Sequence, residues 1–125
     1  MITGRVTPYY EAAIPVVLRG RDQSAERVEF VIDTGFDGSL CLPPDEVAAL
    51  GLSPMGAQRV VLGDGSEAKL LIYEVEVEWH GRLLLVNALG AKGAALLGMA
   101  MLRGSKVTME VVTHGSVLVE PMPEP

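Results

Sequence analysis

The chain contains a single cysteine, Cys41, so no disulfide can form within it. No apolar run approaches the roughly 20 residues that a membrane-spanning helix requires. Residues 1–5 also lack the basic and apolar segments of a secretory signal peptide. We therefore expect a cytoplasmic protein that needs neither a disulfide nor a membrane.

Basic residues are also few. Ten Lys and Arg stand against sixteen Asp and Glu, which gives a formal net charge of −6, and the basic residues are scattered along the chain. A nucleic-acid-binding protein needs clustered positive charge to neutralise phosphates. The composition therefore argues against a nucleic-acid partner.

Apolar residues, in contrast, are abundant. They make up 49% of the 125 residues, which is enough for one well-packed domain. A chain of 125 residues is too short for a two-lobed enzyme. We expect residues 1–120 to form this domain. The proline-rich residues 121–125 are expected to be a disordered tail.

Short apolar segments separated by turn residues predict many strands and few helices. Strands are expected at 13–18, 27–32, 39–42, 58–62, 67–79, 83–89, 94–98, 106–112 and 116–120. Helices are expected only at 43–51, where proline and acidic residues come first and glycine last, and at 99–102. This pattern predicts an all-β barrel or sandwich.

The segment from Glu74 to Trp79 alternates strictly between glutamate and apolar residues. Such a period of two predicts a half-buried strand whose glutamates face water, and a solvated strand face is preferred here over a metal site. Cys41 is interpreted as a small buried hydrophobe. His80 and His114 each precede a glycine and are assigned to exposed turns.

The tripeptide Asp33-Thr34-Gly35 follows an apolar strand and places a lone carboxylate in a glycine-bearing turn. Glycine lets other backbone approach closely, and the turn can supply hydrogen-bond donors to the acid. An ordinary turn would have the same composition, so the context of the motif matters.

Two further features follow in a fixed order: a glycine-tipped hairpin containing Val61-Leu62-Gly63-Asp64-Gly65, and the segment Leu96-Leu97-Gly98-Met99. Together with Asp33-Thr34-Gly35-Phe36, this order resembles the retroviral-like (retropepsin-type) aspartic proteases. More narrowly, it resembles the small bacterial clan AA subfamily that carries Asp-Thr-Gly-Phe. The resemblance extends from about Val16 to Val119.

The resemblance implies an all-β, closed retropepsin-like barrel with one or two short helices and a glycine-tipped flap hairpin. It also implies a homodimer, because the chain has one Asp-Thr-Gly and the catalytic site of this class uses two aspartates. Asp33 of each copy would activate a water molecule that attacks a peptide bond, with no metal or cofactor. Thr34 would hold the two turns together, and Gly35 would leave space beside the acids.

The substrate would be a peptide or protein bound as an extended strand under the flap. The residues assigned to substrate binding are Phe36, Asp37, Gly63, Asp64, Gly65, Leu96, Leu97 and Gly98. Leu96 and Leu97 are expected to line the cleft wall and pack beneath the turn, while Gly98 allows a close backbone crossing.

The chain departs from the retroviral pattern at two places. Phe36 stands where those enzymes usually have alanine, and it either narrows the cleft or packs into the core. Asp37 stands where they have an aspartate that meets substrate backbone and pairs with a nearby arginine. Met99 and Ala100 occupy the arginine's position here, so Asp37 is alternatively only a turn residue.

The function predicted from these features is that of an aspartic endopeptidase. A second reading is a non-catalytic barrel of the same fold that binds peptides or a partner protein. A third is an unrelated β-barrel in which Asp-Thr-Gly is only a turn.

Overall fold

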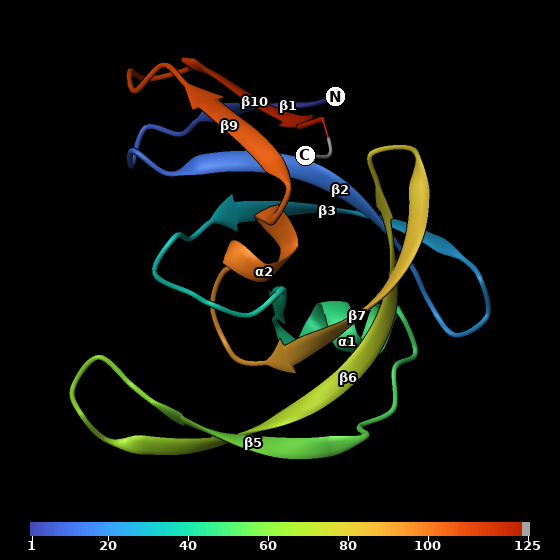
Figure 1. Ribbon diagram of the computed structural model, residues 1–125. Helices are drawn as coiled ribbons and strands as arrows, with labels where there is room; N and C mark the ends of the chain where they lie inside the picture. The colour runs from blue at the N-terminus through green and yellow to red at the C-terminus, as the bar shows by residue number, and fades with distance from the viewer. Residues whose placement is uncertain (124–125) are drawn as a thin grey trace.

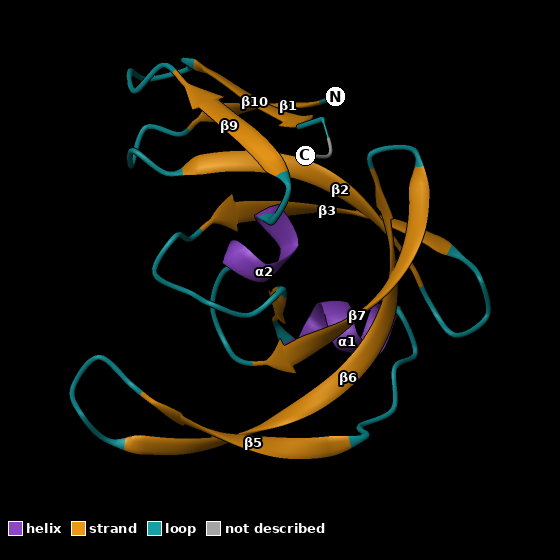
Figure 2. Cartoon of the chain, viewed as in Figure 1, coloured by secondary structure: helices purple, strands orange, loops and turns teal. Residues whose placement is uncertain are grey.

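The computed structural model describes residues 1–123 and consists mainly of strands, with two short helices (Figures 1 and 2). The strands are β1 (Ile2–Val6), β2 (Ala12–Arg19), β3 (Ala25–Ile32), β4 (Leu40–Leu42), β5 (Gly56–Val61), β6 (Glu67–Trp79), β7 (Arg82–Gly90), β8 (Leu96–Leu97), β9 (Ser105–Met109) and β10 (Ser116–Pro121). The helices are α1 (Pro44–Ala49) and α2 (Met99–Leu102). The predicted all-β class is confirmed.

The strands form one ten-stranded sheet in the order β5-β6-β7-β4-β8-β3-β2-β1-β10-β9. Most neighbours are antiparallel, whereas β3–β8 and β4–β7 are parallel. An additional pairing joins β2 to β6 and brings the two halves of the sheet together. That contact consists of only two residue pairs. We call it the seam, because it joins the two halves of the barrel-like sheet.

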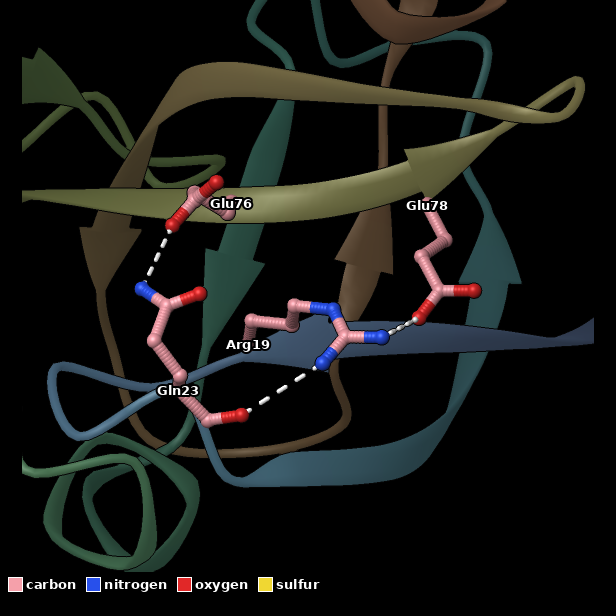
Figure 3. A network of polar contacts seen from close by, with 4 residues as sticks. All are labelled: Arg19, Gln23, Glu76 and Glu78. Atoms are coloured by element: carbon pink, nitrogen blue, oxygen red, sulfur yellow. Dashed lines mark hydrogen bonds and ion pairs between the residues drawn. The ribbon is translucent and has the colours of Figure 1, made fainter.

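Polar side chains reinforce this seam (Figure 3). The Arg19 guanidinium donates to Glu78 Oε2 at 3.0 Å, and Gln23 Nε2 donates to Glu76 Oε1 at 2.9 Å. The sequence pattern predicted that Glu74, Glu76 and Glu78 all face water, but two of them, Glu76 and Glu78, make side-chain hydrogen bonds. An ion pair as exposed as Arg19–Glu78 contributes about 0–1 kcal/mol, so the seam depends mainly on strand pairing and packing.

The core lies inside the curve of the sheet. In β6 the expected alternation is confirmed, because Val75, Val77 and Trp79 are buried while Glu74 and Glu78 are exposed. Cys41 is buried too, and desolvation raises the pKa of its thiol. The side chains with the least exposure include Ile14, Leu18, Phe30, Leu40, Leu42, Leu50, Leu97, Val117 and Val119.

Helix α1 lies within the predicted range 43–51 and spans Pro44–Ala49. Pro44 occupies the first turn, where a missing amide proton costs no hydrogen bond. Gly51 follows with φ of +63°, a conformation that suits glycine. Val47 and Leu50 pack this helix onto the core.

The two chain ends meet at one end of the sheet. β1, which the sequence did not predict, lies between β2 and β10. β10 extends through Pro121, and the Met122 amide donates to the Gly104 carbonyl at 2.9 Å. Strand pairing therefore passes the predicted domain end at residue 120, while the last two residues of the predicted tail lie outside the described part of the chain.

The turn between β6 and β7 differs from its prediction. His80 is half-buried rather than exposed, and its Nε2 lies 2.8 Å from Ser105 Oγ at the start of β9. His114, in contrast, is exposed as predicted. None of the described helices is long and apolar enough to cross a membrane.

Candidate active site

Asp33 directly follows the last residue of β3, and its backbone is held by the neighbouring strand. The Asp33 amide donates to the Leu97 carbonyl at 2.9 Å. The Gly35 amide donates to Asp33 Oδ1 at 2.9 Å, so the turn itself supplies a donor to the carboxylate. The Phe36 amide closes the turn onto the Asp33 carbonyl at 3.2 Å. The half-buried carboxylate is thereby held at a defined position.

Gly98 lies directly beneath this turn, where its lack of a side chain is required. A Cβ on Gly98 would collide with the Gly38 carbonyl oxygen and would lie 2.7 Å from the Phe36 carbonyl oxygen. Three amides of the segment bind the loop: Gly98 to Ser39 O at 2.9 Å, Met99 to Phe36 O at 2.8 Å and Ala100 to Gly38 O at 3.1 Å. The close crossing expected at Gly98 is present and anchors the Asp33 loop.

The predicted flap is the long hairpin of β5 and β6, whose tip lies on the same side of the molecule as the Asp33 turn (Figure 1). At the tip Gly65 adopts φ of +84°. Asp64 Oδ1 accepts bonds from the Ser66 hydroxyl at 2.5 Å and from the Ser66 amide at 2.9 Å. These bonds stabilise the carboxylate and lower the pKa of Asp64 below its usual value. The tip is thus a tight turn closed by its own side chains.

A cleft of about 510 Å³ separates the Asp33 loop from the hairpin. Its walls comprise residues 35–40 of the loop, 58–61 of β5, and Ile72, Asn87, Leu89 and Ala100. The volume falls within the range of ligand-binding clefts, about 300–1,000 Å³. The cleft is therefore large enough for a segment of extended peptide. Gly35 of the turn lines it, whereas Asp33 is not among its lining residues.

The predicted substrate-binding residues occupy three different environments. Phe36 and Asp37 line the cleft. Gly63, Asp64 and Gly65 form the exposed hairpin tip beyond it.

The remaining three lie beneath the loop. Leu97 is fully buried, Leu96 is half-buried, and neither these leucines nor Gly98 is among the residues that line the cleft. In this single chain they support the Asp33 loop from beneath.

Part of the cleft was not predicted from the sequence. Gln58 and Val60 of β5 and Asn87 and Leu89 of β7 contribute to its walls. Strand alternation could have indicated the β5 face. The contribution of β7 could not have been inferred, because it depends on the parallel pairing of β4 with β7.

Thr34 is exposed, and it faces a second cavity, of about 520 Å³, on the other side of the turn. Ile32, Met99, Val107 and Met109 contribute to its mainly apolar lining. An exposed apolar surface next to the turn is a typical protein-contact surface. Among the described residues, no group of three His, Cys, Asp or Glu side chains could hold a metal ion.

Comparison with known proteins identifies the fold. No family model and no curated protein sequence matches the chain. Among solved structures, a retropepsin-like aspartic protease from Rickettsia conorii aligns with a TM-score of 0.59 and 14% identity, over 97% of this chain and 90% of that one. The EIAV protease, solved with the inhibitor HBY-793, aligns with a TM-score of 0.57 and 20% identity, over 71% of this chain and 84% of that one. The chain therefore has the retropepsin-like fold that its motifs predicted.

Proposed function

We propose that this retropepsin-like chain is an aspartic endopeptidase that acts as a homodimer, with one Asp33 from each copy at the two-fold axis. The observation that carries the proposal is the Asp33-Thr34-Gly35 turn, which is anchored from beneath by the Leu97–Gly98 segment and opens beside the cleft under the hairpin. A second copy is needed, because the sequence holds only one such motif.

The chemistry follows from bringing two carboxylates together. Two acids a few ångströms apart do not both ionise readily, so they share a proton and titrate as a pair. The ionised Asp33 takes a proton from a water molecule between them, and that water attacks the scissile carbonyl carbon. The protonated Asp33 of the other copy stabilises the developing oxyanion and then protonates the leaving amine. No cofactor takes part in these steps.

The surface around Thr34 supports the dimeric arrangement. If the two Asp33 side chains meet, Thr34 and the adjacent apolar cavity must face the second copy. Met99 and Met109 at that cavity are substantially exposed in the single chain, so their burial would favour association. In the proposed dimer, Thr34 contacts its counterpart and keeps the two turns in register.

The proposal is tested by peptide cleavage between pH 4 and 8, with the wild type and Asp33→Asn compared across a range of protein concentrations. We expect the wild type to cleave, with activity per protomer rising with concentration, and Asp33→Asn to be inactive. Asp22→Asn is a matched control, because Asp22 is an exposed carboxylate in the distant turn between β2 and β3. Activity of Asp33→Asn equal to that of the wild type would exclude the mechanism. Peptide binding without cleavage by the wild type would favour the non-catalytic barrel.

A further inference from the structure

Phe36 occupies a fixed position in the floor of the cleft. Its amide is bonded to the Asp33 carbonyl at 3.2 Å, and its own carbonyl accepts the Met99 amide at 2.8 Å. The backbone on both sides of the side chain is thus tied, once to the catalytic turn and once to the start of α2. The side chain must project from a backbone that cannot easily move.

The ring of Phe36 is packed against two glycines. A Cβ on Gly38 would lie 2.7 Å from both Cε1 and Cζ of the ring, and a Cβ on Gly98 would lie 2.6 Å from Cδ2. Both distances are far below van der Waals contact, so the ring occupies the space that side chains at these positions would need. The ring cannot retreat toward either glycine. Since Phe36 is only half-buried, the remainder of its surface faces the cleft.

The cleft beside the ring is lined by both polar and apolar residues, Asp37, Gln58 and Asn87 being among the polar ones. Of the apolar ones, Val60 and Ile72 come from the hairpin, Leu89 from β7 and Ala100 from α2. Val60, Ile72 and Leu89 are each half-buried and belong to well-paired strands. The ring of Phe36 thus takes up volume in a cleft whose apolar wall residues are also held in place. Where such fixed groups face a bound side chain, an extra methylene that does not fit is costly.

We propose that Phe36 limits the size of the substrate side chain that faces it, so that the protein selects extended peptides with alanine or valine at that position and rejects leucine and phenylalanine. The selection of peptides for cleavage rests on the proposed function above. The selection at the binding step does not require catalysis. Phe36 therefore both packs beneath the loop and narrows the cleft, and the two readings of its role in the sequence are compatible.

Binding is measured with Asp33→Asn protein, so that no peptide is consumed. The probes are octapeptides of apolar, extended sequence in which each position in turn is alanine, valine, leucine or phenylalanine, and affinity is measured by calorimetry. We expect one position at which leucine or phenylalanine weakens binding at least tenfold relative to alanine. In Asp33→Asn/Phe36→Ala that penalty should disappear, and in Asp33→Asn/Phe36→Leu it should be intermediate.

Leu71→Ala in the same background is the control, because Leu71 is an exposed residue of the hairpin that does not line the cleft. If Phe36→Ala folds poorly, Phe36→Leu replaces it in the test, because leucine retains an apolar side chain against the glycines. A size penalty that is the same in all variants, or the absence of any peptide binding, would overturn the inference. Wild-type cleavage is measured in parallel. Size-selective binding without cleavage would refute the peptidase alone, and cleavage with a size preference independent of residue 36 would refute only the role of Phe36.

Discussion

At the scale of a residue, Gly98 shows why the segment beneath the Asp33 loop needs glycine. Its backbone passes so close to the loop that a Cβ would lie 2.6 Å from the Phe36 ring and 2.7 Å from the Phe36 carbonyl oxygen. Gly56 offers a contrast, since a Cβ there meets nothing within 4 Å. Glycine is thus required at position 98 for steric reasons, whereas position 56 has space for a side chain.

Gly98→Ala should therefore destabilise the fold by about 1–3 kcal/mol, the usual cost of inserting a methyl group into closely packed surroundings. Gly56→Ala should change stability far less. The measurement is urea unfolding followed by circular dichroism, with the free energy of unfolding compared among the three proteins. A Gly98→Ala protein as stable as the wild type would mean that the loop shifts without cost.

Individual residue roles were predictable to different degrees. The Asp33 turn and the close approach at Gly98 could be inferred, because Asp-Thr-Gly favours a turn and glycine permits close approach of other backbone. That Leu97 is fully buried while Leu96 is only half-buried could not be inferred, since β8 has only two residues and pairs with β3 on one side and β4 on the other. Which leucine faces the core is decided by these long-range pairings and not by local alternation.

At the scale of the elements, hairpins were the easiest to predict and terminal strands the hardest. The β2–β3 and β5–β6 hairpins have alternating patterns joined by turn residues, and both are present. β1 is short and contains Gly4, and it pairs through four residues with β10 from the far end of the chain but through only two with β2. A strand that depends on so distant a partner leaves little local signal.

The β6–β7 turn contacts β9 through His80, and the contribution of this contact to stability should depend on pH. His80 bonds to Ser105 of β9, and its ring lies beside that of Trp79. Its Nδ1 is buried and has no hydrogen-bond partner among residues 1–123. Burial first, and then the positive charge of the chain's amino terminus, lower the pKa of His80 below 6.5 in the folded protein. The fold thus favours the neutral imidazole.

A histidine with a lowered pKa contributes stability above the unfolded value of about 6.5, and this contribution is lost as pH falls toward the folded pKa, because the unfolded chain then binds the extra proton. We expect the urea concentration at the unfolding midpoint to decrease as the pH is lowered from 7.5 to 5.5. His80→Asn, which tolerates the positive φ of 50° at this position, should flatten this dependence. His114→Asn is the matched control, because His114 also has a positive φ, of 65°, at an exposed turn. Equal slopes in the wild type and His80→Asn would exclude His80 as the source.

At the scale of the whole molecule, the sequence predicted the class of fold but not how the sheet comes together. The motifs indicated a retropepsin-like barrel, and the solved structures agree. The seam between β2 and β6 is only two residue pairs long and joins segments about 60 residues apart, as the Leu18–Val77 pair shows. No local pattern specifies such a contact, because it results from the bending of β2 and β6 around the shared core.

The proposed dimer makes a prediction about association itself. A two-fold axis near Asp33 would bury the surface around Thr34, including Met99 and Met109, which are 49% and 38% exposed in the single chain. Fully burying an exposed methionine is worth about 1.5–3 kcal/mol. About half of that remains to be gained at these half-exposed residues, and an isologous interface contains each of them twice. Met99→Glu or Met109→Glu should therefore weaken dimerisation by at least about 100-fold, which corresponds to about 3 kcal/mol.

Sedimentation equilibrium over a wide range of protomer concentrations measures this change directly. Leu85→Glu is the matched control, because Leu85 is 63% exposed and lies on β7 beside another cavity, away from Thr34. We expect Leu85→Glu to dimerise like the wild type, while the two methionine variants remain monomeric at concentrations where the wild type is paired. If the site requires both Asp33 carboxylates, peptidase activity of these variants must fall with the dimer fraction and recover at high concentration. Unchanged dimerisation in both methionine variants would place the interface elsewhere, and since a two-fold axis at Asp33 must cover Thr34, it would also argue against the paired active site.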